Sequence, residues 1–123
     1  MTAWSQGYSG TGVTIGIVDT GIDSDSPEFA GRIHPASADV AGDRGIDPES
    51  DHGTNVAMVA AAARDNTGVL GIAFNATIAM FRADTPGSCA TQDAEVKDSG
   101  CTFNDVNIAA GVDKAVAAGA KVI

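Results

Sequence analysis

A run of β-branched residues near the start of the chain limits the fold more than any other feature. Residues 13–18 read Val-Thr-Ile-Gly-Ile-Val, and the run ends abruptly at Asp19, which is followed by Thr20 and Gly21. An apolar run bounded by turn residues is typical of a strand buried on both faces, as in a parallel sheet. Functional groups gather at the carboxyl ends of such strands, so Asp19 is a candidate functional residue. Its alternative role is to begin a turn.

Strand and helix patterns alternate along the rest of the chain. The Ala-rich stretch at 51–64 predicts a helix with Ser50 or Asp51 as its N-cap and Arg64 in its last turn. Asp105 is predicted to cap a second helix. This order predicts right-handed crossovers and an α/β fold, a parallel sheet with helices on both faces that stops within its fourth strand. The expected strands lie at 13–18, 31–34, 76–82 and 120–123, and the expected polar loops at 35–50 and 84–104.

Length and charge restrict the class of protein. The 123 residues are one domain's length, and 44% of them are hydrophobic, which is typical of a globular chain. The net charge of −9 argues against nucleic acid as a partner and is permissive for calcium, although an acidic solvated surface is the plainer explanation. No apolar run approaches the ~20 residues of a membrane helix, and the first residues carry no signal-peptide pattern. This fits a cytosolic protein or a segment of a longer secreted one.

The two cysteines, Cys89 and Cys101, flank a polar loop. Neither lies near a histidine at metal-ligand spacing, so we expect no zinc site. Two free thiols are one alternative. We favour a loop-closing disulfide, which would contribute on the order of 2–3 kcal/mol through chain entropy and would indicate an oxidising compartment.

Two polar side chains occupy privileged places in the expected fold. Asp19 follows the first strand, and His52 begins the first long helix. A parallel βαβ arrangement can bring these two positions together at one edge of the sheet. A carboxylate that accepts a hydrogen bond from a histidine fixes the tautomer of the ring and stabilises the imidazolium that forms in catalysis. Gly53 is expected to leave room for a substrate or nucleophile, while an exposed capping role is the alternative for His52.

Two motifs, in this order, carry a resemblance to a known family. They are Val-Asp-Thr-Gly-Ile-Asp at 18–23 and Asp-His-Gly-Thr-Asn-Val-Ala at 51–57, with weaker matches at 68–73, 76–82 and 117–123. Together they resemble the subtilisin-like serine proteases, the subtilase family, over nearly the whole chain. The resemblance implies a three-layer, Rossmann-like subtilisin fold, of which residues 1–123 would be the N-terminal part of the peptidase domain. The cysteine-bearing segment is similar to the bacterial autotransporter branch of the family.

Because members of this family attack peptide bonds with a serine hydroxyl, the resemblance implies a serine endopeptidase. Asp19 would be the triad aspartate and His52 the base, while the serine would lie in a later Gly-Thr-Ser motif that the 123 residues do not contain. The implied partners are a protein or peptide substrate and the remainder of the catalytic domain. The chain by itself is expected to be inactive and to self-associate. The implied location is extracellular or at a bacterial cell surface, including the outer membrane.

The chain departs from the family pattern at two helix positions. At a third position, where some members bind calcium, it has a glutamate. Asn55 stands where the family usually has His, and Met58 where it usually has Gly, so we expect both to alter the shape of the substrate subsites. Glu28 occupies a place where some members have a calcium-binding Asp, with Asp23 and Asp25 nearby. Calcium is therefore an optional ligand and no cofactor is required; a solvated acidic turn is the plainer interpretation.

Other functions fit the same residues less well. Asp-Thr-Gly at 19–21 also marks aspartic proteases, but these are all-β and use a second carboxylate that shares a proton. A Rossmann-like binding module would need a Gly-x-Gly-x-x-Gly after the first strand, and none follows. The remaining alternative is a catalytically dead interaction domain with the subtilase fold, for which the downstream sequence would lack Gly-Thr-Ser.

Overall fold

The structure, a computed structural model, describes residues 3–90 and 100–123. No helix within these ranges is long and apolar enough to cross a membrane. Short 3-10 helices lie at Ala3–Gln6, Pro27–Phe29 and Ser88–Ala90. The other elements, in chain order, are β1 (Thr14–Asp19), β2 (Ala38–Asp39), α1 (His52–Ala61), β3 (Thr77–Arg82) and α2 (Asp105–Ala117).

The sheet is parallel, with the strand order β1-β3-β2. β1 pairs with β3 along its whole length, from Thr14 opposite Thr77 to Asp19 opposite Arg82. Because the two strands are parallel neighbours and α1 lies between them in the chain, they form the βαβ arrangement expected from the alternating pattern. The predicted α/β class with a parallel sheet is confirmed.

The predicted strand at 31–34 contributes a single bridge, from Ile33 to β3. The regular strand β2 begins after the following turn, inside the segment that we expected to be a loop. Between the two pieces the hydroxyl of Ser37 accepts the backbone N–H of Met80 (3.0 Å), where a strand would offer a carbonyl. The prediction was therefore wrong in its bounds, because a turn interrupts the ladder along this edge of β3.

The predicted strand at 120–123 also pairs through one bridge, between Val122 and β1. The Lys121 N–H donates to the Thr14 carbonyl (2.9 Å), and the Gly16 N–H donates to the Val122 carbonyl (2.8 Å). These bonds follow the pattern of a parallel ladder. The segment therefore lies at the outer edge of β1, as the fourth member of the sheet.

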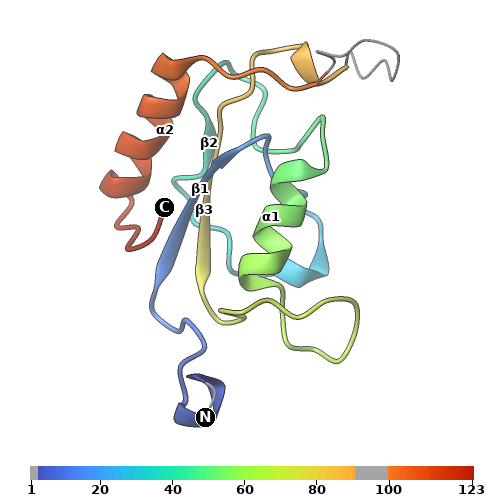
Figure 1. The fold of residues 1–123 in the computed structure, drawn as a ribbon, viewed down its shortest axis with the longest axis vertical. Coiled ribbons are helices and arrows are strands. Elements are labelled where there is room, and N and C mark those ends of the chain that lie inside the picture. Colours follow the sequence, from blue (N-terminus) through green and yellow to red (C-terminus); the bar gives the residue numbers. More distant parts are fainter. Residues whose placement is uncertain (1–2, 91–99) are drawn as a thin grey trace.

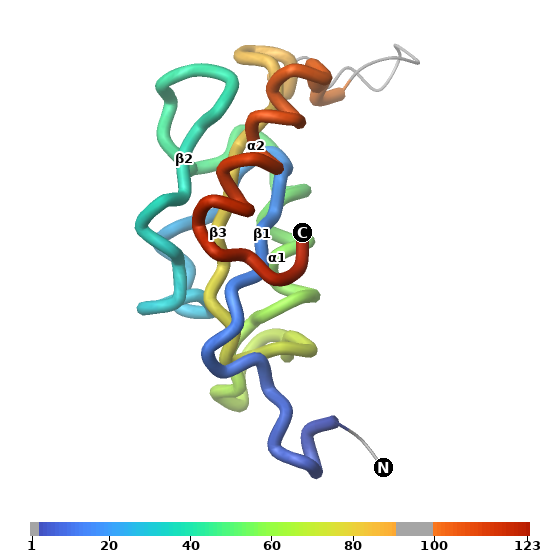
Figure 2. The backbone as a smooth tube through the Cα atoms, turned by 90° about the vertical axis from the view of Figure 1, so that its left-hand side faces the viewer, coloured from blue at the N-terminus to red at the C-terminus, as the bar shows by residue number. Residues whose placement is uncertain are grey.

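The two helices cover opposite faces of the sheet (Figure 1). In Figure 2 α2 lies in front of β1 and β3, and α1 lies behind them. A Cβ on Gly111 of α2 would come within 2.7 Å of Val18 Cγ1, and one on Gly16 of β1 within 2.8 Å of the Ala115 Cβ. The missing side chains therefore set how closely α2 lies on the sheet. The core on the α1 side contains Ile17, Ile22, Phe29, Ala57, Ala61, Ala76, Ile78 and Met80.

α1 ends at Ala61, before Arg64, so the prediction that Arg64 lies in its last turn was wrong. Ala62 has an extended backbone (φ −55°, ψ 145°) that turns the chain out of the helix. Arg64 instead places its guanidinium 5.5 Å from the centre of the Phe74 ring, a cation–π contact.

α2 is capped by the residue before the predicted cap. The Asn104 side chain accepts the Val106 N–H (2.8 Å), while Asp105 is the first helical residue. A carboxylate in the first turn suits the helix dipole, so Asp105 still favours a helix start here. Gly119, with a positive φ of 84°, follows the last turn and lets the chain leave the helix.

Candidate functional site

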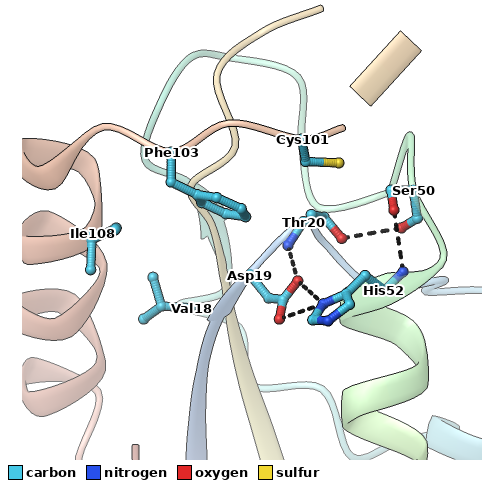
Figure 3. Close-up of a pocket in the computed structure, with 8 residues that line it drawn as sticks. All are labelled: Val18, Asp19, Thr20, Ser50, His52, Cys101, Phe103 and Ile108. Carbon is cyan, nitrogen blue, oxygen red and sulfur yellow. Dashed lines mark hydrogen bonds and ion pairs between the residues drawn. The ribbon is translucent and has the colours of Figure 1, made fainter. Parts of the chain in front are cut away.

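The last residue of β1 and the first residue of α1 meet at one edge of the sheet (Figure 3). His52 Nδ1 lies 2.9 Å from Asp19 Oδ1 and 3.0 Å from Oδ2. Because an ionised carboxylate can only accept, Nδ1 carries the proton and donates it. The Asp19 side chain is 13% exposed and the His52 side chain 69% exposed. The structure thus brings together the two residues that the sequence indicated, with a shielded carboxylate behind an accessible ring.

Thr20 joins the end of the strand to the start of the helix. Its backbone N–H donates to Asp19 Oδ1 (2.7 Å). Its buried hydroxyl donates to the Ser50 carbonyl (3.1 Å) and accepts the Gly53 N–H (3.0 Å). Asp51, the N-cap by position, makes no side-chain hydrogen bond to the helix. Thr20 therefore caps α1 from the end of the neighbouring strand, just past its last residue, a role that its place in the sequence does not reveal.

Gly53 has a different role from the predicted one. It is buried, and a Cβ at this position would overlap the carbonyl oxygen of Gly21. Gly21 itself has a positive φ of 101°, which favours glycine. The prediction that Gly53 opens room for a substrate was therefore wrong, because the space is filled by the main chain after β1. The two glycines let the backbones of β1 and α1 approach each other.

A cavity of about 510 Å³ opens beside the pair. In Figure 3 the Phe103 ring projects from the segment before α2 toward Asp19. Apolar walls with a few convergent polar groups are typical of a ligand site. The lining residues are Val18, Asp19, Thr20, Ser50, His52, Cys101, Phe103 and Ile108.

Cys89 and Cys101 form a disulfide with an S–S distance of 2.15 Å, so the structure contains the bonded alternative and no free cysteine. Cys101 also lines the cavity beside His52. The bond therefore ties one wall of that cavity to the turn that follows β3. Most of the polar loop that it closes, residues 91–99, lies outside the described residues.

A surface groove, here called the α1 groove, begins at His52 and runs along the exposed side of α1. Two adjoining hollows of about 540 Å³ and 520 Å³ make it up. Asn55 borders both of them and Met58 borders the second, while neither residue borders the cavity beside Asp19. The two family departures therefore shape this groove. Its lining consists of His52, Asn55, Val56, Met58, Val59, Ala60, Val69, Leu70 and Ile72.

Glu28, the candidate calcium ligand, is 8% exposed. Its Oε2 has no hydrogen-bond partner in the described parts of the chain. Its Oε1 lies so close to Gly68 that a Cβ there would overlap it. Asp23 and Asp25, by contrast, are exposed and bonded to each other through the Asp25 N–H (3.1 Å). Over residues 3–90 and 100–123, no three His, Cys, Asp or Glu side chains form a cluster that could hold a metal.

Behind the pair lies an ion-pair network that sequence reasoning missed. Arg82 Nε binds Asp84 Oδ1 (2.8 Å), and Arg44 Nη1 binds Asp84 Oδ2 (2.9 Å). Arg44 Nε also binds Asp39 Oδ2 (2.7 Å). The hydrogen bond to Asp84 raises the pKa of Arg82, and the hydrogen bond to Asp39 raises the pKa of Arg44. Scattered charged residues carry no motif, so the sequence offered no signal for this cluster.

The sequence of the chain is similar to those of known proteins, two of which are extracellular proteases. The chain is 44% identical to an extracellular serine protease of Serratia marcescens over 80 residues, 62% of this chain and 8% of that protein. It is 36% identical to furin of Bos taurus over 89 residues, 65% of this chain and 11% of that protein. The minor extracellular protease Vpr of Bacillus subtilis is 30% identical over 132 residues, 98% of this chain and 14% of that protein. The chain thus spans about a tenth of the length of these relatives.

A solved structure and a family pattern cover nearly the whole chain. The structure of fervidolysin from Fervidobacterium pennivorans, a keratinolytic enzyme related to subtilisin, superimposes with a TM-score of 0.70 and 32% identity. The superposition covers 96% of this chain and 17% of that one. The sequence pattern of the subtilase family, peptidase S8, matches residues 10–123. The chain belongs to the subtilase family.

Proposed function

We propose that the protein containing this chain is a subtilisin-like serine endopeptidase, with residues 1–123 as the N-terminal part of its peptidase domain. The observation that carries the proposal is the contact of His52 Nδ1 with both Asp19 oxygens, at 2.9 and 3.0 Å. In the described parts of the chain Nε2 makes no hydrogen bond, so the ring offers a base beside the cavity. Membership of the subtilase family supports the same reaction.

Asp19 and His52 would serve as two members of an Asp-His-Ser triad. Because the bond to Asp19 places the proton on Nδ1, the Nε2 lone pair can take the serine proton while the hydroxyl oxygen attacks the peptide carbonyl carbon. The shielded carboxylate stabilises the imidazolium that results. The imidazolium then returns the proton to the leaving amine, and water hydrolyses the acyl-enzyme by the same steps.

The serine itself is assigned outside the 123 residues. Ser50 is the serine that lines the cavity, but its Oγ accepts the backbone N–H of His52 (3.4 Å), and the hydrogen bonds of the ring go to Asp19. The family resemblance implies a later Gly-Thr-Ser motif, and the relatives are long enough to hold one.

The remainder of the catalytic domain is proposed to pack in the α1 groove. The groove begins at His52, the ring that the serine must reach, and it leaves Val59 71% and Ile72 66% exposed. Contiguous apolar surface of this kind marks an interaction site. The isolated chain should therefore self-associate, and sedimentation should show a concentration-dependent mass that Val59→Ser lowers.

Covalent labelling with a fluorophosphonate, which reacts with activated serine hydroxyls, tests the catalytic assignment. The full-length protein should label, and Asp19→Asn should label more slowly by on the order of 10⁴-fold because the tautomer is no longer fixed. His52→Gln should also label slowly, while His34→Gln, at the only other histidine, is the matched control and should label normally. The 123-residue chain alone should not label.

Two outcomes would contradict the proposal. A folded full-length protein that does not label would favour the catalytically dead interaction domain. Labelling of the 123-residue chain alone would refute the assignment of the serine outside it.

A calcium ion at Glu28 is a second, structural part of the proposal. A buried carboxylate oxygen without a partner is costly, and Arg32 donates to the Glu28 backbone carbonyl rather than to its carboxylate. A hard cation held by this carboxylate and by carbonyls of the turn at 63–70 would satisfy it. The ion would hold that turn and take no part in the reaction.

Thermal unfolding with and without calcium tests this site. Calcium should raise the Tm of the chain, Glu28→Gln should abolish the rise, and the exposed change Asp25→Asn should preserve it. An equal rise in the Glu28→Gln variant would place the ion elsewhere.

We also infer an extracellular location. Two of the relatives are named as extracellular proteases, and a disulfide persists in oxidising compartments. Recovery of the protein from culture supernatant, with Cys89 and Cys101 unmodified by an alkylating agent unless a reductant is added, is the expected result.

A further inference from the structure

Arg82 is the last residue of β3, and Asp19 is the last residue of the neighbouring strand β1. In the sheet register Arg82 stands opposite Asp19, and the N–H of the next residue, Ala83, donates to the Asp19 carbonyl (2.8 Å). Arg82 is 2% exposed although it carries a guanidinium. A buried arginine in such a place must have its donors satisfied by nearby groups.

The Arg82 side chain is bonded to the segment that leads into α1. Nε and Nη2 donate to the two carboxylate oxygens of Asp84 (2.8 and 3.1 Å). Nη1 donates to the Asp47 carbonyl (2.6 Å), and Nη2 lies 3.2 Å from Glu49 Oε1. Two of the three partners therefore belong to the loop just before His52.

Ser50 ends that loop and is bonded to both sides of the site. Its carbonyl accepts the Thr20 hydroxyl (3.1 Å), and its Oγ accepts the His52 backbone N–H (3.4 Å). A continuous series of contacts thus runs from the Arg82 guanidinium through residues 47–50 to the first residue of α1. Arg82 thus stands opposite Asp19 in the sheet, and its side chain is linked to His52 through residues 47–50.

The geometry requires an arginine. A planar guanidinium can bind the Asp84 carboxylate with two nitrogens and still direct the third at the Asp47 carbonyl, whereas a lysine has one nitrogen. Asp84 is fully buried and also receives Arg44 Nη1 (2.9 Å), so its position is fixed from two sides.

We propose that Arg82 is a positioning residue for His52. Arg82 holds residues 47–50 in place, and these residues orient the His52 ring toward Asp19. The inference rests on the proposed function, because the orientation matters for a reaction only if the pair acts in a triad. Its test, however, measures the pair directly and needs no peptidase activity.

Nitrogen NMR of the 123-residue chain carrying ¹⁵N-histidine is the experiment, because the chain has two histidines, His34 and His52. The unchanged chain should show the Nδ1–H tautomer at His52 near neutral pH. In Arg82→Lys the ratio of the Nε2–H to the Nδ1–H tautomer at His52 should rise by ~2-fold or more, because the partner of a ring nitrogen selects the tautomer. The His34 signals should not change.

Arg32→Lys is the matched control. Arg32 is half-buried and donates to the backbone carbonyls of Ala76 and Glu28, near the opposite end of β3. It should destabilise the chain without changing the tautomer ratio of His52. An equal ratio in the two lysine variants would overturn the proposal, since Arg82 would then act on stability alone.

Glu49→Gln decides the question if the Arg82→Lys chain does not fold. The Glu49 side chain is 39% exposed, so its replacement leaves the core intact while it removes an ion pair of Arg82. A smaller rise of the same ratio at His52 would support the proposal, and an unchanged ratio would overturn it. A shifted ratio in a chain whose full-length protein does not label with fluorophosphonate would support the coupling and refute the proposed function.

Discussion

The two helices begin in different ways, although both start at the same edge of the sheet (Figure 1). α2 is capped by its own neighbour, since Asn104 accepts the Val106 N–H (2.8 Å). α1 is capped by Thr20, the residue after β1, whose hydroxyl accepts the Gly53 N–H (3.0 Å). The start of α2 is therefore encoded locally, whereas the start of α1 forms only when the strand that carries Asp19 is in place. Of the two helices, α1, which bears His52, is thus the one whose start depends on the strand that carries Asp19.

Gly53→Ala should have the largest effect on this difference. The new Cβ would overlap the Gly21 carbonyl oxygen, a main-chain atom that cannot rotate away. We expect a loss of about 3 kcal/mol in the free energy of unfolding, measured in urea. Gly111→Ala is the matched change in α2, where the Cβ would meet Val18 Cγ1 at 2.7 Å. A side chain yields at a lower cost than the main chain does, and alanine gains about 1 kcal/mol of helix propensity, so the net loss should be smaller than for Gly53→Ala. Equal losses would contradict the comparison.

Thr20→Val should have the next largest effect. It keeps the shape of the side chain but removes the cap of α1 and the bond to the Ser50 carbonyl. The buried Gly53 N–H and the partly buried Ser50 carbonyl lose their partner, so we expect a loss of about 2 kcal/mol. Thr54→Val, which removes one bond, from the Asp23 N–H (2.9 Å), should cost about half as much. The idea of a tertiary cap fails if Thr20→Val costs no more than Thr54→Val.

Asp39→Asn should weaken the loop before α1 in a pH-dependent way. Burial raises the pKa of Asp39, but hydrogen bonds from the Arg44 side chain and from the Ala41 and Arg44 N–H groups together lower it, from 3.8 to about 2. Because the folded pKa is the lower one, the carboxylate stabilises the fold by about 2 kcal/mol above pH 4, and this is lost as pH falls toward 2.

Urea unfolding at several pH values measures how much the Asp39 carboxylate contributes to the free energy of unfolding. The cost of Asp39→Asn should be about 2 kcal/mol at pH 7 and should shrink below pH 4. Asp113→Asn, an exposed change on α2, is the control and should cost less than about 0.5 kcal/mol. A cost of Asp39→Asn that is the same at pH 7 and pH 2.5 would rule out the ion pair with Arg44 as its source.

Asn104→Ala should have the smallest effect, about 1 kcal/mol, because the local cap is one hydrogen bond at an exposed helix end. Asn104→Asp should restore most of the loss, since aspartate caps equally well. The tautomer of His52, followed by NMR, should remain as in the unchanged chain. A change at His52 would show that the two helix starts are coupled after all.

The difference between a local cap and a cap from a distant residue also explains what could be predicted from the sequence. The approach of Asp19 and His52 follows from the βαβ pattern, because the end of a strand and the start of the next helix share an edge. The family motifs pointed to the same pair. The Thr20 cap could not be predicted, because its hydroxyl and the Gly53 N–H are 33 residues apart in sequence. Nothing local distinguishes it from an ordinary turn residue.

The end of α1 was mispredicted for a related reason. An Ala-rich sequence favours helix beyond Ala61, yet the chain leaves the helix at Ala62. There the Ala63 N–H donates to the Glu28 carbonyl (3.2 Å), and the Gly71 N–H donates to the Ala62 carbonyl (3.1 Å). Contacts with distant segments override the local preference, and no pattern within the helix reveals them.

Gly21 and Gly53 approach each other through main-chain atoms, and the Thr20 hydroxyl holds α1 by buried bonds. Neither contact uses the carboxylate of Asp19 or the ring of His52. Replacing either residue would break the Asp19–His52 contact without removing a bond that joins the strand to the helix. Over evolutionary time a descendant can therefore lose the proposed chemistry in one substitution and keep its fold, because natural selection for the scaffold and natural selection for the chemistry act on different residues.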